Sequence, residues 1–145
     1  MNIICILQNA WGDRKLPMIF RPNPYNKSAK VIRKMVGTEH VFDFCNTTDV
    51  VTETAKGNPS INENHFSDVI LSISLKQLTD NPYDLILVCG RQAERAVNLN
   101  MDRLNNINIP IIIVPHPASR SLSNIQIDQI NKNINALSFQ GYKKK

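Results

Sequence analysis

Side chains suited to recognising a nucleobase follow the short apolar runs of this sequence. Amides can read the edge of a base, aromatic rings can stack on its face, an imidazole can donate or accept a proton, and arginine and serine can bind phosphate. In chain order these residues are Gln8, Asn9, Trp11, Asn46, Arg91, His116, Ser119 and Arg120. This mixture of residue types predicts a nucleobase pocket.

Four apolar runs of β-branched character indicate the strands that position these side chains. They are Ile3 to Leu7, Val41 to Cys45, Leu85 to Cys89 and Ile111 to Val114. Apolar residues at helical spacing lie between and after them, within residues 31–36, 66–73, 93–104 and 127–137. Apolar strands that alternate with amphipathic helices predict a three-layer α/β/α fold around a central four-stranded parallel sheet. Ligands of such sheets bind at the carboxyl ends of the strands, where the polar residues lie.

Length, charge and cysteine usage narrow the class of protein. The chain has 145 residues, 42% of them hydrophobic, so we expect one domain over 1–145. Its formal net charge of +5 favours a polyanionic partner such as nucleic acid. Cys5, Cys45 and Cys89 show no pairing or metal-ligand spacing, which predicts reduced core cysteines, no metal and a cytoplasmic location. No apolar run approaches the roughly 20 residues of a membrane span, so we expect a soluble protein without a membrane partner.

Four blocks of sequence follow one another in the order of a known family. They are Gln-Asn-Ala-Trp at 8–11, Phe-Arg-Pro-Asn-Pro-Tyr-Asn-Lys at 20–27, Gly-Arg-Gln-Ala at 90–93 after an apolar strand, and His-Pro-Ala-Ser-Arg at 116–120. Together they resemble the mismatch-specific and single-strand-selective branches of the uracil-DNA glycosylase superfamily. The first block is similar to the family's Gly-Gln-Asp-Pro-Tyr or Gly-Ile-Asn-Pro-Gly loop, and the last to its His-Pro-Ser-Pro-Arg loop.

The resemblance implies a monofunctional DNA glycosylase, a hydrolase that excises uracil or a C5-modified pyrimidine flipped out of DNA, as in base-excision DNA repair. It implies a monomer that needs no metal or cofactor. By resemblance, Asn9 positions the attacking water and His116 stabilises the departing base. The remaining roles that it implies are base binding by Gln8, Trp11, Phe20 and Asn46, and DNA binding by Ser119, Arg91 and the wedge residue Arg120.

Departures from the family pattern keep two other functions open. Leu7 and Ala10 replace a glycine and a proline of the first loop, and Asn9 can orient a water but cannot accept its proton. The second interpretation is therefore a member of the same fold that binds a modified or flipped base without cleaving it. The third is a nucleotide- or nucleoside-processing protein on a flavodoxin-like sheet, which the absence of a glycine-rich phosphate loop disfavours.

Overall fold

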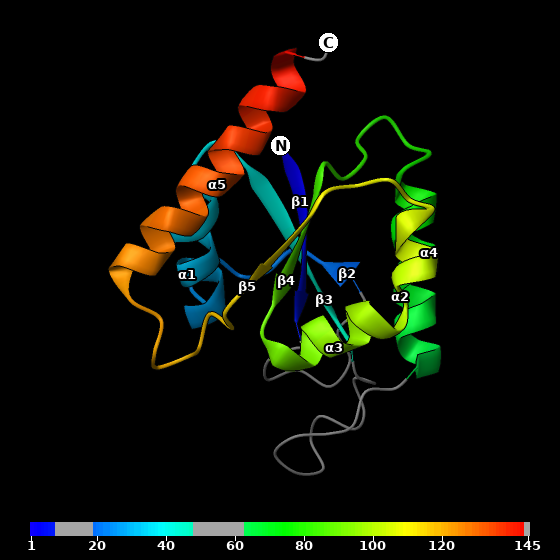
Figure 1. Cartoon of the computed structure of the whole chain (residues 1–145), viewed down its shortest axis with the longest axis horizontal. Coiled ribbons are helices and arrows are strands. Elements are labelled where there is room, and N and C mark those ends of the chain that lie inside the picture. Colours follow the sequence, from blue (N-terminus) through cyan, green and yellow to red (C-terminus); the bar gives the residue numbers. More distant parts are fainter. Residues whose placement is uncertain (8–18, 48–62, 144–145) are drawn as a thin grey trace.

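The computed structural model describes residues 1–7, 19–47 and 63–143. Strands and helices are interspersed along the chain in these ranges (Figure 1). They are β1 (Asn2–Leu7), β2 (Ile19–Phe20), α1 (Lys27–Val36), β3 (Val41–Asn46), α2 (Glu63–Lys76), β4 (Leu85–Cys89), α3 (Arg91–Leu99), α4 (Met101–Asn105), β5 (Ile111–Val114) and α5 (Asn124–Lys143). The broad α/β class predicted from the sequence is thus confirmed.

The four predicted strands are β1, β3, β4 and β5, each within one residue of its predicted bounds. They pair in parallel in the spatial order β3-β1-β4-β5. The register places Leu7 of β1 beside Asn46 of β3, and Cys89 of β4 beside Val114 of β5. The carboxyl ends of neighbouring strands therefore lie at one edge of the sheet, which we call the carboxyl edge.

The prediction of a purely parallel, four-stranded sheet was wrong. A fifth strand, β2, pairs antiparallel with β3 and makes the sheet five-stranded and mixed. Its two residues, Ile19 and Phe20, lie opposite Cys45 and Phe44. An ion pair of 2.8 Å between Arg21 and Asp43 continues this pairing beyond the strand. Two residues are too few to produce a period in the sequence, so β2 depends on tertiary contacts and has no local signal.

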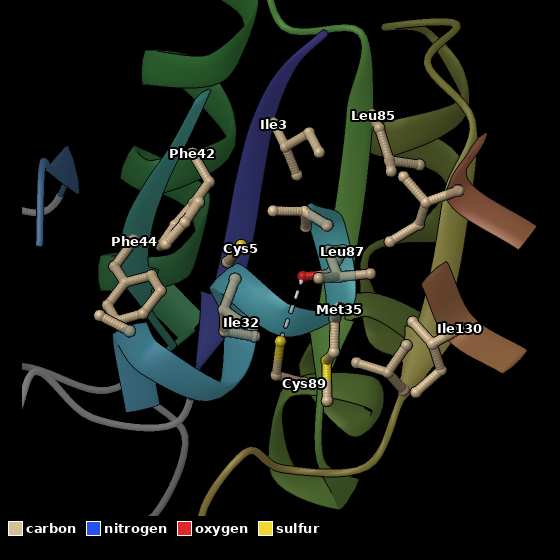
Figure 2. Packing of buried hydrophobic residues seen from close by; sticks show 14 of the residues in the cluster. Ile3, Cys5, Ile32, Met35, Phe42, Phe44, Leu85, Leu87, Cys89 and Ile130 are labelled. Atoms are coloured by element: carbon tan, nitrogen blue, oxygen red, sulfur yellow. Dashed lines mark hydrogen bonds between the residues drawn. The ribbon is translucent and has the colours of Figure 1, made fainter. Parts of the chain in front are cut away.

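Helices cover both faces of the sheet (Figure 1). Helices α1 and α5 pack on one face, where Ile32, Met35 and Ile130 meet the strand residues Ile3 and Leu87 (Figure 2). Helices α2, α3 and α4 pack on the other face through a second buried cluster. Because both faces are covered, every residue of β1 and β4 is buried, which explains why these strands are continuous apolar runs.

The cysteines lie in this core as the sequence predicts. Cys5, Cys45 and Cys89 are free thiols and are buried. The Cys89 thiol donates to the carbonyl oxygen of Leu87 at 3.7 Å (Figure 2). Burial raises the pKa of the Cys5 and Cys45 thiols above their ordinary value, so these two thiols stay protonated and unreactive.

Two of the helices have ends that the sequence explains. The Asn26 side chain accepts a hydrogen bond from the backbone N–H of Ala29 and so caps the start of α1. The helical stretch predicted over 93–104 is divided at Asn100, whose side-chain amide donates to the carbonyl oxygen of Ala96 at 2.8 Å. This bond satisfies a carbonyl at the end of α3, and α4 begins at the next residue. The prediction of one continuous helix there was wrong.

Candidate functional site

The carboxyl edge brings together the ends of the four parallel strands. Asn46 is the last residue of β3, Gly90 and Arg91 follow β4, and His116 lies two residues beyond β5. Three strand steps separate β3 from β5, and at the usual spacing of strands this is about 14 Å. Asn46 and His116 thus lie at the same edge of the sheet, with the ends of β1 and β4 between them.

His116 is held by a tight turn. The backbone N–H of Ser119 donates to the carbonyl oxygen of His116 at 2.9 Å, which closes a turn over residues 116–119. Inside this turn the backbone N–H of Ala118 donates to Nδ1 of the His116 ring at 3.0 Å. The imidazole is therefore oriented by the main chain of its own turn.

The hydrogen bond from Ala118 also selects a tautomer of His116. Nδ1 can accept it only through its lone pair, so the proton of the neutral ring lies on Nε2. Burial lowers the pKa of His116 below its ordinary value of 6.5, which keeps the ring neutral at physiological pH. Nε2–H is then a fixed hydrogen-bond donor at the carboxyl edge.

Gly90 makes room for His116. Its φ is 93° and its ψ is 171°, a backbone conformation that side chains rarely adopt. A Cβ at this position would lie 3.0 Å from the Cβ of His116, and the Gly90 N–H donates to the carbonyl oxygen of Val114 at 2.9 Å. The turn after β4 thus abuts the segment after β5, and glycine is the residue that fits there without strain.

Asn46 lies at the end of β3, three strands away from the end of β5. It is 1% exposed, and the next residue, Thr47, is fully buried and donates its backbone N–H to the carbonyl oxygen of Leu7 at 2.9 Å. This bond extends the pairing of β3 and β1 beyond the strand and fixes the backbone around Asn46. An amide in such a position offers both a donor and an acceptor, the combination that reads the edge of a pyrimidine.

Phe20 lies on β2, at the same side of the sheet as Asn46. Its ring is half-buried and meets the Phe44 ring edge-on, with 6.0 Å between the ring centroids. Phe44 and Asn46 are two residues apart on β3 and point to the same face of the sheet. Phe20 thus lies on the Asn46 side of the sheet, and its stacking role stays a prediction.

The three residues predicted to bind DNA all lie at the carboxyl edge. Arg91 is the exposed first residue of α3, and Arg120 is exposed just after the His116 turn. Ser119 is half-buried, and its hydroxyl pairs with that of Ser121 at 2.9 Å. Their predicted role in DNA binding stays a prediction.

Three predicted site residues lie outside the described part of the chain. They are the base-binding residues Gln8 and Trp11 and the water-positioning residue Asn9. Residues 48–62, which follow β3, also lie outside it. The roles assigned to these residues stay predictions.

The structure adds two site features that the sequence analysis did not assign. One is the Ala118 N–H, which fixes the tautomer of His116, and the other is the close approach of Gly90 to that ring. The sequence signal for the first feature is a histidine two residues before a residue with a backbone N–H. This spacing is common in turns of every kind, so it does not identify the hydrogen bond. The approach of Gly90 joins two strands that are distant in sequence and has no local signal.

Comparisons with protein-family models, with curated proteins and with solved structures found no match to this chain. The resemblance to the uracil-DNA glycosylase superfamily therefore depends on the four sequence blocks. Within the three described ranges, no helix combines the length and the apolarity needed to cross a membrane. In the same part of the chain, no group of three or more His, Cys, Asp or Glu side chains is placed to hold a metal ion.

The environments of two histidines, His40 and His116, predict a loss of stability in mild acid. Burial lowers the pKa of His116, and burial followed by the nearby N-terminal ammonium lowers that of His40, both from 6.5. As the pH falls through 6.5, the unfolded chain binds protons before the folded one, so stability present above this pH is lost below it. We expect the urea midpoint to fall between about pH 8 and about pH 5.5. The urea midpoint should fall less in His116→Asn than in the wild type. An equal fall would contradict the contribution of His116 to this pH dependence.

Proposed function

We propose that this chain is a DNA glycosylase that hydrolyses the N-glycosidic bond of uracil or a C5-modified pyrimidine flipped out of DNA. The observation that carries the proposal is the neutral His116 ring with its proton on Nε2, at the same edge of the sheet as the buried Asn46. The order of the four resembling sequence blocks supports it independently.

The proposed chemistry needs a hydrogen-bond donor more than it needs an acid. When the bond between the sugar C1′ and the base nitrogen breaks, the electron pair leaves with the base, and a water oxygen bonds to C1′. The proton that this water loses passes through solvent to the base anion. His116 Nε2–H would donate to the base oxygen on which negative charge develops, and Asn46 would hold the amide edge of the same base. Preorganised donors of this kind lower the barrier because they do not have to reorient during the reaction.

A test is a base-release assay on single- and double-stranded oligonucleotides that carry uracil or C5-substituted uracils, scored by alkaline cleavage. We expect release from these substrates and none from matched oligonucleotides with cytosine at the same position. We also expect Asn9→Ala to lower release, since Asn9 is the proposed water-positioning residue. No release at high protein concentration, with oligonucleotide binding intact, would refute the glycosylase proposal.

That negative outcome would favour the second candidate, a protein that binds a flipped or modified base without cleaving it. The observation in its favour is that residue 9 is an asparagine, because an amide cannot take the proton of the attacking water. Recognition by Asn46 and His116 would be the same in both cases. Selective binding of the modified oligonucleotide over the cytosine control, without release, would identify this function.

A further inference from the structure

Helix α1 carries only positive charge. The sequence of Lys27–Val36 contains Lys27, Lys30, Arg33 and Lys34 and no acidic residue. Lys27, Lys30 and Lys34 are three and four residues apart, so they form a stripe on one side of the helix. The seven-residue interval from Lys27 to Lys34 is about 10 Å long at 1.5 Å per residue. A stripe of like charges repels itself and is stabilised by an external anion.

A cavity of about 340 Å³ lies beside this stripe. Its walls include Arg21, Lys30, Arg33 and Lys34, and its apolar surface comes from Phe42 and two prolines of the segment before α1. No acidic side chain is among the described residues that line it. The cavity therefore combines four cationic side chains with an apolar surface, which suits a ligand that carries both an anionic group and a ring.

The four cations differ in how far their charges are already engaged. Arg33 lies over the Phe42 ring at 4.6 Å and donates to the carbonyl oxygens of Gly37 and His40. Arg21 pairs with Asp43. Lys30 and Lys34 are exposed and one helical turn apart, and their side chains make no hydrogen bond or ion pair with any residue that the structure describes. These two lysines are the charges available to a ligand.

Helix α1 connects this cavity with the carboxyl edge. Residue 41, shortly after the helix, donates its backbone N–H to the carbonyl oxygen of Met1, so α1 ends at the opposite edge of the sheet. The helix consequently begins on the side of the carboxyl edge, as Figure 1 shows. The stripe from Lys27 to Lys34 therefore leads from the region of Asn46 towards the cavity.

We propose that the lysine stripe of α1 and its cavity bind the phosphodiester backbone of DNA outside the base pocket. The inference rests on the proposed function in taking DNA as the partner. A backbone is favoured over a single free phosphate because the stripe is about 10 Å long, and a DNA strand presents a phosphate about every 3.4 Å along its axis. The apolar surface around Phe42 would then pack against a sugar or a base of the bound strand.

The experiment measures the salt dependence of DNA binding for the double variant Lys30→Gln/Lys34→Gln. Fluorescence anisotropy of a labelled duplex between about 50 and 200 mM salt gives the slope of log K against log salt concentration. Two lost phosphate contacts should reduce that slope by about 1.8 for a duplex, or about 1.4 for a single strand. The matched control is Lys76→Gln/Lys132→Gln, which removes the same charge from α2 and α5 and should leave the slope unchanged.

The outcomes separate this inference from the glycosylase proposal. A reduced slope, with base release at saturating DNA unchanged, supports the backbone surface. A reduced slope in a protein that releases no base supports the surface and refutes the glycosylase. An unchanged slope, or the same reduction in the control, overturns the inference even if base release is observed. Replacing chloride by inorganic phosphate at constant ionic strength should weaken DNA binding equally in the wild type and in Lys30→Gln/Lys34→Gln. Weaker DNA binding in the wild type alone would show a free-phosphate site and overturn the inference.

Discussion

His116→Ala should reduce the rate of base release by about 10²–10³-fold, because it removes a preorganised donor to the departing base. The effect is expected in single-turnover rates at saturating DNA. DNA binding should change little, because His116 affects contacts with the DNA phosphate backbone only through the turn that contains Ser119. The measurement is the base-release assay on uracil-containing oligonucleotides, with anisotropy as the readout of binding.

His116→Asn separates the donor from the turn. An asparagine side-chain oxygen can still accept the N–H of Ala118, in place of Nδ1, so the turn over residues 116–119 is kept. It places no donor where Nε2 stands in the wild type. We expect this variant to lose base release as strongly as His116→Ala while it unfolds at a urea concentration near that of the wild type. Full activity in His116→Asn would show that the Nε2–H is not required.

Gly90→Ala should lower the free energy of unfolding by about 1–3 kcal/mol, since alanine at a φ of 93° and a ψ of 171° is strained. The same substitution adds a Cβ only 3.0 Å from the Cβ of His116, an atom bonded directly to the main chain rather than the end of a flexible side chain. His116 must then shift, so base release should also fall in the fraction of the protein that is folded. Urea unfolding and single-turnover release measure the two effects separately.

The fold offers a matched control for this variant. Gly37 has nearly the same backbone conformation, with a φ of 84° and a ψ of 173°, and its added Cβ would meet only the Asn131 amide at 3.4 Å. Gly37→Ala should therefore have a similar strain cost and leave base release intact. If Gly90→Ala and Gly37→Ala lose the same stability and release base at the same rate, Gly90 is needed for its backbone conformation and not for the room it leaves to His116.

Much of the architecture could be predicted because the buried parallel strands have a strong sequence signal. Strands covered on both faces require continuous apolar residues, and the run from Leu85 to Cys89 shows this directly. The two errors concern features without such a signal. β2 is held by pairing with β3 and by the ion pair between Arg21 and Asp43, and the break at Asn100 depends on one side-chain hydrogen bond.

The position of the candidate site in the fold could be predicted better than its local geometry. His116 and Asn46 could be named because both follow predicted strands and because ligands gather at that end of a parallel sheet. The tautomer of His116 could not be predicted, because it depends on a turn geometry that brings the Ala118 N–H to Nδ1. The positive φ of Gly90 likewise follows from the packing of β4 against β5, which sequence spacing does not reveal.

The two edges of the sheet differ in their exposure to other chains. At one edge β2 is two residues long and is followed by a charged residue and a proline, Arg21 and Pro22, which prevent a further strand from pairing. At the other edge β5 presents Ile113, which is 50% exposed, and a row of backbone groups on its outer side. Aggregation of concentrated protein should therefore start at β5, and a charged residue in place of Ile113 should improve its solubility.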